Sequence, residues 1–307
     1  MIVSALGGPE VLKVTELPDP VARPSQVVVR VQAVTVQPAD IAATTGMIPR
    51  GPVPPPFLPG WDIAGEVSSV GSDVTEFRVG DHVVGMIPWY LTRGAPGGYA
   101  EFVPAETDWL IRRPDGLDAV PAATLPLNGL TAYQALSLLS LDEPSTVLVT
   151  GASGGVGGFG AQLAARQGHH VLAVASEGDE AWVGQLGVAE VIPRSVDLAT
   201  VGPVPYVLDA IPLGKAAEAV IEDGGSVVTT RPTPPIDPKR GVRQDLQLIR
   251  LDRDLLAELV GLLATGELRT RVATTMPLAE AAEAHRLVEA GGLRGKVVLV
   301  PMWSDAR

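Results

Sequence analysis

The sequence predicts an α/β protein with two domains, a partly open β-barrel and a doubly wound parallel sheet. Short Val-rich runs separated by Gly and Pro fill residues 1–114, a pattern typical of a barrel of short strands. From 115 to 251, apolar strands alternate with helical stretches, which favours a parallel sheet with helical crossovers. The tail, 252–307, ends in a short strand that we expect to return to the first domain. A chain of 307 residues with 46% hydrophobic content is long enough for about two domains.

Individual runs support the barrel and its return segment. Gln26–Val31 and Gly80–Gly85 are β-branched stretches bounded by turn residues, as expected for short strands. In the tail, apolar residues at helical spacing predict helices over 253–263 and 278–290. The closing strand is predicted over Lys296–Val300.

The central region contains six predicted strands. The first two are separated by an amphipathic stretch over 159–167, and the order strand, helix, strand defines a βαβ unit. The six strands are expected at Thr146–Thr150, His170–Ala175, Glu190–Ile192, Tyr206–Asp209, Gly225–Thr229 and Leu246–Leu251.

A glycine-rich turn, Gly151–Gly157, joins the first of these strands to its helix. Gly154 and Gly157 suit a backbone that turns sharply, admits a pyrophosphate against bare N–H groups and packs the helix closely on the strand. The helix N-terminus would favour the phosphate charge. The alternative is a tight strand-to-helix turn that uses glycine for structural reasons alone.

Charge and composition limit the partners. A formal net charge of −12 argues against nucleic acid or an anionic membrane as partner. The first residues, Met1–Gly8, lack the basic region of a signal peptide, and no apolar run approaches the ~18 residues that span a bilayer. We therefore expect a cytoplasmic protein.

Metal ligands are scarce in this sequence. With no cysteine, disulfides and thiolate zinc sites are excluded. The four histidines, His82, His169, His170 and His285, lack any metal-ligand spacing, so no metal site is predicted.

Six further motifs follow one another over almost the whole chain: Gly7–Leu12, Pro59–Val67, Gly80–Val83, Gly97–Phe102, Gly129–Tyr133 and Gly295–Leu299. Together with the glycine turn, they make the chain resemble the zinc-independent quinone oxidoreductase branch of the medium-chain dehydrogenase/reductase superfamily. The resemblance implies a GroES-like catalytic domain from 1–114 and 252–307, and a Rossmann nucleotide-binding domain from 115–251. It also implies a nicotinamide cofactor in the cleft, and usually a homodimer.

The resemblance also indicates the class of reaction. Zinc alcohol dehydrogenases of this superfamily place a ligand Cys and a Gly-His-Glu motif where this chain has Gln37 and Gly60–Trp61–Asp62. Without a metal, no Lewis acid holds an alkoxide. Such a site suits hydride transfer to a quinone or to a C=C bond conjugated with a carbonyl, with the nicotinamide held about 3–3.5 Å from the acceptor.

The substrate pocket departs from the family pattern, so no catalytic residue is assigned. The usual Asn-Pro-x-Asp signature is Gln37–Asp40 here, and tyrosines of some relatives are Ala42 and Ile48. Solvent could supply the proton. The pocket candidates have structural alternatives, a backbone-bonded amide or a capping carboxylate. These candidates are Gln37, Asp40, Ile48 and Asn128.

The cofactor site is predicted in more detail. In the resemblance Thr131 contacts the nicotinamide ribose, with helix capping as the alternative. Ser176, at the end of the second strand, tolerates a 2′-phosphate, and Arg194 suits one. Glu177 is the competing residue, since a carboxylate there would bind the 2′-OH of NADH. We favour NADPH, with NADH open. The predicted cofactor residues are Thr131, Ser153, Gly154, Gly155, Val156, Gly157, Ser176, Arg194 and Thr230.

The favoured function is therefore an NADPH-dependent, zinc-independent quinone, enone or enoyl reductase. Candidate pocket walls at 47–48, 86–90 and 229–231 indicate a small hydrophobic substrate, although core packing explains them as well. Two alternatives stay open. One is a metal-free alcohol or aldehyde oxidoreductase, and the other is a catalytically inert NADPH-binding protein with a crystallin-like or redox-sensing role.

Overall fold

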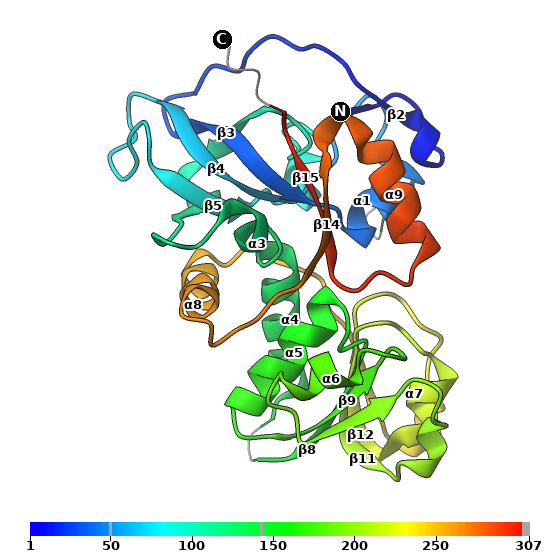
Figure 1. Cartoon of the computed structure of the whole chain (residues 1–307). Helices are drawn as coiled ribbons and strands as arrows, with labels where there is room; N and C mark the ends of the chain where they lie inside the picture. The colour runs from blue at the N-terminus through cyan, green and yellow to red at the C-terminus, as the bar shows by residue number, and fades with distance from the viewer. Residues whose placement is uncertain (49–50, 142–143, 303–307) are drawn as a thin grey trace. The chain divides into compact units, whose positions relative to one another are not determined.

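The computed structural model describes residues 1–48, 51–141 and 144–302, and the chain divides into two compact units. Unit 1 comprises Met1–Leu127, Leu251–Glu267 and Arg271–Arg307, and unit 2 comprises Asn128–Arg250 with Leu268–Thr270 (Figure 1).

The boundary after Leu127 lies later than the sequence indicated, because residues 115–127 belong to unit 1. Helix α3, Ala119–Ala123, packs on the sheet of that unit, and the Thr35 hydroxyl donates to the carbonyl of Ala123 at 2.7 Å.

Unit 1 is built on a seven-stranded sheet. Its path runs β14-β15-β3-β4-β5-β7, and β6 pairs with the other edge of β3. The strands are β3 (Gln26–Thr35), β4 (Asp62–Val70), β5 (His82–Met86), β6 (Phe102–Glu106), β7 (Leu110–Arg112), β14 (Val272–Pro277) and β15 (Lys296–Val300). A separate pair is formed by β1 (Ile2–Val3) and β2 (Leu12–Lys13). Five α-helices described in the unit are α1 (Pro38–Thr44), α2 (Trp89–Thr92), α3, α8 (Arg253–Ala264) and α9 (Ala281–Ala290).

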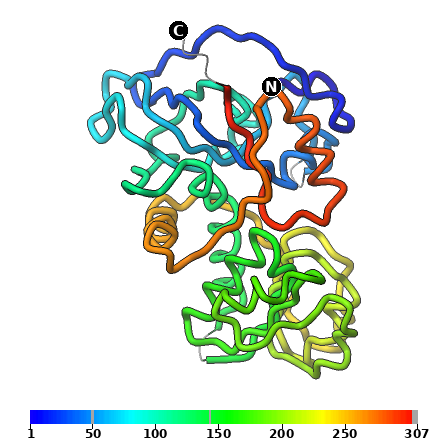
Figure 2. The backbone as a smooth tube through the Cα atoms, viewed as in Figure 1, coloured from blue at the N-terminus to red at the C-terminus, as the bar shows by residue number. Residues whose placement is uncertain are grey.

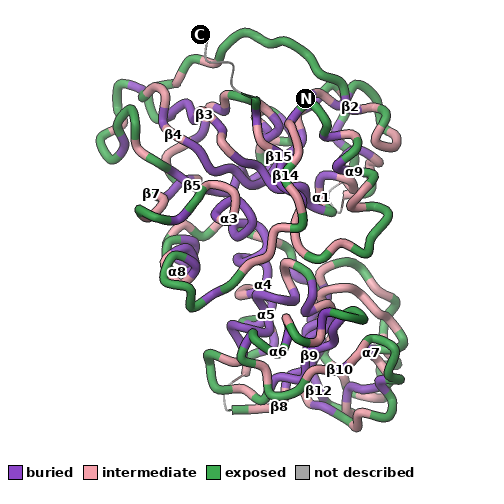
Figure 3. Tube along the Cα trace, in the orientation of Figure 1, coloured by how far each residue is buried: buried purple, intermediate pink, exposed green. Residues whose placement is uncertain are grey.

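The tail returns to the first domain as expected. In β15, Val298 pairs antiparallel with Thr35 of β3, and on its other side β15 runs parallel to β14. The red C-terminal strand therefore lies beside the blue β3 (Figure 2). Most residues of β3 and β4 are buried (Figure 3). The predicted helix over 278–290 begins as a 3₁₀ turn, and its α-helical part starts at Ala281.

Unit 2 is a six-stranded parallel sheet in the order β10-β9-β8-β11-β12-β13. Its strands are β8 (Thr146–Thr150), β9 (His170–Ala175), β10 (Glu190–Pro193), β11 (Val204–Asp209), β12 (Ile221–Thr229) and β13 (Arg243–Leu246). Its helices are α4 (Pro126–Leu139, whose first two residues belong to unit 1), α5 (Gly155–Arg166), α6 (Glu180–Gly184) and α7 (Lys215–Val220). The core of the unit includes Leu148, Val207 and Val227. No helix in the described part of the chain is long and apolar enough to cross a membrane.

The sixth strand is not where the sequence predicted it. β13 ends at Leu246, whereas the apolar run suggested Leu246–Leu251. The Gln247 N–H still donates to the Thr229 carbonyl of the neighbouring strand. The residues after it are bonded to the side chain of Gln134 instead of to the backbone of a neighbouring strand. Gln134 accepts hydrogen bonds from the Gln247 side chain at 2.9 Å and from the Arg250 N–H at 3.1 Å. The predicted strand was therefore wrong beyond its first residue.

Candidate functional site

The carboxyl ends of the parallel strands gather the predicted cofactor residues at one edge of unit 2. The glycine turn follows β8, Ser176 follows β9, Arg194 follows β10 and Thr230 follows β12. Since neighbouring strands are parallel, these positions share one edge of the sheet, where open α/β sheets bind ligands.

Two positions of the glycine turn have a geometry that only glycine accommodates easily. Gly151 has φ +66°, and its carbonyl accepts the N–H of Gly154 at 2.9 Å. A Cβ on Gly157 would lie 2.3 Å from the Gly151 oxygen, so the helix packs too closely on the turn for a side chain there. Helical bonding begins when the Gly158 N–H donates to Gly154 at 3.0 Å, which leaves the N–H groups of the first turn for another acceptor. This arrangement fits the diphosphate of a dinucleotide.

Asn128 lies against this turn. A Cβ on Gly155 would come within 2.6 Å of the Asn128 Oδ1, so glycine leaves room for the amide. Asn128 is buried and belongs to unit 2, whereas the other pocket candidates, Gln37, Asp40 and Ile48, belong to unit 1. Thr131, one helical turn further along α4, is also largely buried.

Ser153 connects the glycine turn to the next strand. Its hydroxyl accepts the N–H of Ser176 at 2.9 Å, so the two predicted residues are joined directly. Pro193 pairs with Ala175, and the Arg194 N–H donates to the Ala175 carbonyl at 2.8 Å. This register places Arg194 next to Ser176, and both are exposed.

A hydrogen bond joins the carboxyl ends of β8 and β11. The Thr150 hydroxyl donates to Asp209 at 2.7 Å, and the other Asp209 oxygen accepts the N–H of Leu213 at 2.8 Å. Burial raises the pKa of Asp209, although both donors favour its ionised form. Thr230 donates to the carbonyl of Ala210 at 3.0 Å and is half-buried. Hydrogen bonds therefore connect the neighbouring strand ends on this side of the edge.

Unit 1 contains a buried polar network around Gln37. The Gln37 amide nitrogen donates to Asp62 at 2.6 Å, and its amide oxygen accepts the ammonium of Lys296 at 2.8 Å. The other Asp62 oxygen accepts the N–H of Leu127 at 2.7 Å, in the first turn of α4. Gln37 and Asp62 are fully buried, and Lys296 is half-buried. Gln37 thus joins α1, β4 and β15.

Asp40 accepts hydrogen bonds from two separate backbone segments of the same unit. Its carboxylate accepts the N–H of Gln37, which caps α1, and the N–H of Gly60, both at 2.8 Å. The Tyr99 hydroxyl lies 3.3 Å from Asp40 and 3.1 Å from the Nε2 of His285. If Tyr99 donates to the carboxylate, the His285 Nε2–H donates to Tyr99.

Burial shifts the titration of this network. It raises the pKa of Asp40 and of Asp62 to about 7, against the hydrogen bonds and Lys296, which favour the carboxylates. Burial lowers the pKa of Lys296 to about 8 and that of His285 to about 4. The ammonium is thus the positive charge that stabilises two buried carboxylates.

The sequence analysis did not predict a site role for four residues of this network, Asp62, Lys296, Tyr99 and His285. The available signal was a charged residue directly before an apolar strand, at Asp62 before Ile63 and at Lys296 before Val297. Ile48 is half-buried and directly precedes residues outside the described range.

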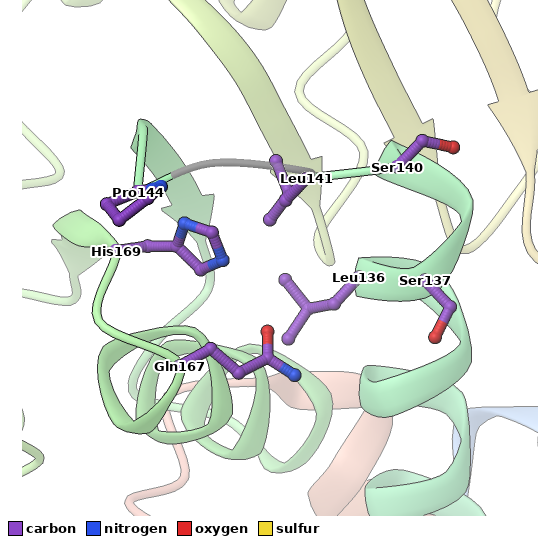
Figure 4. A pocket seen from close by; sticks show the side chains of 7 residues that line it. All are labelled: Leu136, Ser137, Ser140, Leu141, Pro144, Gln167 and His169. Carbon is purple, nitrogen blue, oxygen red and sulfur yellow. The ribbon is translucent and has the colours of Figure 1, made fainter.

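A cavity of about 360 Å³ lies elsewhere in unit 2 (Figure 4). It is lined by residues that follow α5 or end α4, such as Gln167, His169 and Leu136. His169 accepts the N–H of Ser145 through Nδ1 at 3.2 Å. These positions precede β8 and β9, so the cavity lies at the amino edge of the sheet, opposite the glycine turn.

A parallel sheet with a glycine turn at its carboxyl edge, in a chain that also forms a β-rich unit, is typical of nucleotide-dependent dehydrogenases. Comparisons with known proteins agree. Residues 23–115 match the family of alcohol dehydrogenase GroES-like domains, and residues 186–299 match the zinc-binding dehydrogenase family.

The relatives define the branch. The chain is 32% identical to a chloroplast envelope quinone oxidoreductase homolog of Arabidopsis thaliana, over 96% of this chain and 95% of the relative. It is 30% identical to a quinone oxidoreductase of Pseudomonas aeruginosa, over 97% and 98%. The quinone oxidoreductase structure from Coxiella burnetii is similar with a TM-score of 0.89 and 30% identity, over 98% of both chains. The chain belongs to the quinone oxidoreductase branch of the medium-chain dehydrogenase/reductase superfamily and is an oxidoreductase.

The family name raises the question of a metal. Among the described residues, no group of three His, Cys, Asp or Glu side chains is placed to hold a metal ion. At the positions where zinc relatives carry ligands, Gln37 is bonded to Lys296 and Trp61 has an indole side chain. Neither the Gln37 amide nor the Trp61 indole is a side chain that zinc sites in proteins ordinarily use.

Proposed function

We propose that this protein transfers a hydride from NADPH, without zinc, to a quinone or to a C=C bond conjugated with a carbonyl. The observation that carries the proposal is the glycine turn at the carboxyl edge of the sheet. Its first helical turn offers N–H groups to a diphosphate, and Gly157 allows the close packing that positions them.

The preference for NADPH rests on Arg194. The β9 and β10 register supports this preference, because it puts the backbone of Arg194 next to that of Ser176, both exposed, at the strand end where dinucleotide-binding folds recognise the ribose 2′ position. A guanidinium forks a phosphate with two hydrogen bonds, whereas a 2′-OH gives it little to bind. Glu177 is exposed at the same edge and is the residue that would favour NADH.

The acceptor class rests on the chemistry of unit 1. The motif positions that hold ligands in zinc relatives carry Gln37, fixed by Lys296 and Asp62, and Trp61. An alcohol needs a Lewis acid or base to lose its proton, but a conjugated acceptor takes up hydride at carbon and delocalises the charge. Bound NADPH supplies that hydride.

The test compares kcat/KM with NADPH and NADH, using 9,10-phenanthrenequinone as acceptor. Wild type is expected to prefer NADPH. Arg194→Gln should lower kcat/KM for NADPH by about tenfold or more, the worth of a charged hydrogen bond, and leave that for NADH within about twofold. Glu177→Gln is the matched control and should not weaken NADPH use.

A preference for NADH that Glu177→Gln abolishes would contradict the NADPH assignment. A panel of quinones, enones and secondary alcohols separates the remaining functions. Oxidation of a secondary alcohol as the main activity would favour the alcohol oxidoreductase, and stoichiometric NADPH binding without turnover would favour the inert binding protein. The small hydrophobic substrate, the homodimer and the cytoplasmic location stay predictions.

A further inference from the structure

Trp61 carries a buried hydrogen-bond donor that the protein does not use. The residue is 6% exposed, and within the described part of the chain its Nε1 has no hydrogen-bond partner. The neighbouring Trp89 shows the contrast, since its Nε1 donates to the carbonyl of Leu58 at 2.8 Å. A buried donor without a partner has lost its hydrogen bond to water and gained none in return, so it calls for a functional explanation.

The backbone that carries Trp61 is held on both sides. Gly60 has φ +107°, and a Cβ there would lie 2.7 Å from the backbone of Gly98 and Tyr99. The Gly60 N–H is bound by Asp40, and the Asp62 side chain is bound by Gln37 and Leu127. The Trp61 carbonyl accepts the Ile87 N–H at 2.6 Å. The indole is thus a preorganised donor on a rigid segment.

Two aromatic rings lie next to that of Trp61. One neighbour, Tyr90, is half-buried, and its ring centroid lies 6.1 Å from that of Trp61. The other neighbour, Trp89, belongs to the core, 6.0 Å away by centroid. The Tyr90 side therefore lies next to the surface. A flat apolar ligand with one hydrogen-bond acceptor matches a donor in such a setting.

We propose that the indole N–H of Trp61 donates a hydrogen bond to the carbonyl oxygen of the quinone or conjugated acceptor. The proposal rests on the proposed function and assigns it a catalytic residue. The donor to the acceptor oxygen is then a neutral group of the protein.

Hydride transfer to the acceptor is favoured by a hydrogen-bond donor at the acceptor's carbonyl oxygen. The acceptor gains a hydride, its carbonyl oxygen takes up the electron pair of the broken π bond, and the nucleotide is oxidised in the same step. The indole keeps its proton, and water supplies the proton that completes the product. The bond from Trp61 strengthens as negative charge grows on oxygen, so it stabilises the transition state more than the bound substrate.

The kinetic test is Trp61→Phe, with NADPH and 9,10-phenanthrenequinone. We expect kcat/KM for the quinone to fall about 10- to 100-fold, mainly through kcat, which is the worth of one hydrogen bond to a charged acceptor. The KM for NADPH should stay within about twofold. Trp109→Phe is the control, because Trp109 ends the 3₁₀ turn Thr107–Trp109 before β7, outside the candidate pocket walls, and its loss should leave kcat unchanged.

A spectroscopic test uses the wild-type protein. The chain has five tryptophans, and the indole N–H signal that disappears in Trp61→Phe identifies Trp61 in a ¹H–¹⁵N spectrum. Adding 9,10-phenanthrenequinone without reduced nucleotide should move that signal downfield, as expected for a new hydrogen bond. Selective ¹⁵N labelling with assignment by neighbouring residues serves if Trp61→Phe does not fold.

The outcomes separate this inference from the function on which it rests. A wild type that oxidises NADPH with quinone while Trp61→Phe has the same kcat contradicts the role of Trp61 and leaves the function intact. A Trp61 signal that the quinone does not move also contradicts it. A wild type without turnover on any quinone or enone contradicts the proposed function itself.

Discussion

Asp62 and Lys296 belong to a buried network whose charges depend on one another. Moving a carboxylate or an ammonium out of water costs several kcal/mol per ion, and only mutual attraction and hydrogen bonds offset it. Here Gln37 bridges the two ions, and Asp40 lies in the same network. Removing the single ammonium leaves two buried carboxylates without their counter-charge.

Lys296→Met is therefore expected to destabilise the protein, and more so at neutral than at acidic pH. The pKa of Asp40 and Asp62 is raised to about 7, so the native state binds protons more tightly than the unfolded state between the ordinary value of 3.8 and about 7. Stability from these groups therefore falls as pH rises through that range. Without Lys296 both pKa values rise further and the fall steepens. Urea unfolding near pH 7.5 should show a loss of about 3 to 5 kcal/mol.

Near pH 5 the carboxyls are protonated, and the loss should be clearly smaller. Lys13→Met, at an exposed position in β2 of the same unit, is the matched control and should change stability little at either pH. A loss for Lys296→Met that is equal at the two pH values, or larger at pH 5, would refute this account of the network.

Some contacts of individual residues could not be predicted from the sequence. Gln37 and Asp40 were recognised as candidates, with a backbone-bonded amide and a capping carboxylate as alternatives. In the structure Asp40 accepts the N–H of Gln37 at the start of α1, and the Gln37 amide is bonded to the side chains of Asp62 and Lys296. The partner Lys296 lies 259 positions from Gln37, and no local pattern reveals a contact at that separation. Trp61 was quoted in a motif, but an unpaired N–H is visible only in three dimensions.

At the scale of elements, the sequence predicted correctly those turns and helices whose conformation depends on neighbouring residues in the chain. The turn Gly151–Gly157 and the helix after it follow from steric limits on backbone approach, so sequence sufficed to place them. Strand β13 is different because its end is set by Gln134 of α4, whose side chain captures residues 247 and 250. Apolar periodicity carries no information about such a distant side chain.

Gly157→Ala tests the turn as an element. The new Cβ would lie 2.3 Å from the Gly151 carbonyl, so the turn must shift. The Kd for NADPH, measured by fluorescence titration, should rise at least about tenfold, equivalent to about 1.4 kcal/mol. Gly184→Ala, in α6 of the same unit, is the control, because its Cβ would meet only a side-chain atom at 3.8 Å. Unchanged NADPH affinity in Gly157→Ala would show that the turn does not bind the cofactor.

At the scale of the whole molecule, the chain builds each unit from separate segments. Unit 1 takes its last strand, β15, from the far end of the chain, and unit 2 is nearly continuous. Both the fold class and the return of the tail were predicted, because the order of elements restricts the possible topologies. The domain boundary was predicted after residue 114, whereas the compact units divide after Leu127, since α3 has no signal in the sequence that distinguishes the two units.

The proposed reaction is hydride transfer from a dinucleotide held by the glycine turn, without a metal. The most direct measurement is NADPH oxidation with 9,10-phenanthrenequinone by protein treated with a strong chelator and checked for metal content. We expect metal-free protein to keep its full turnover and added zinc not to raise it. Turnover that disappears on chelation and returns with stoichiometric zinc would contradict the account.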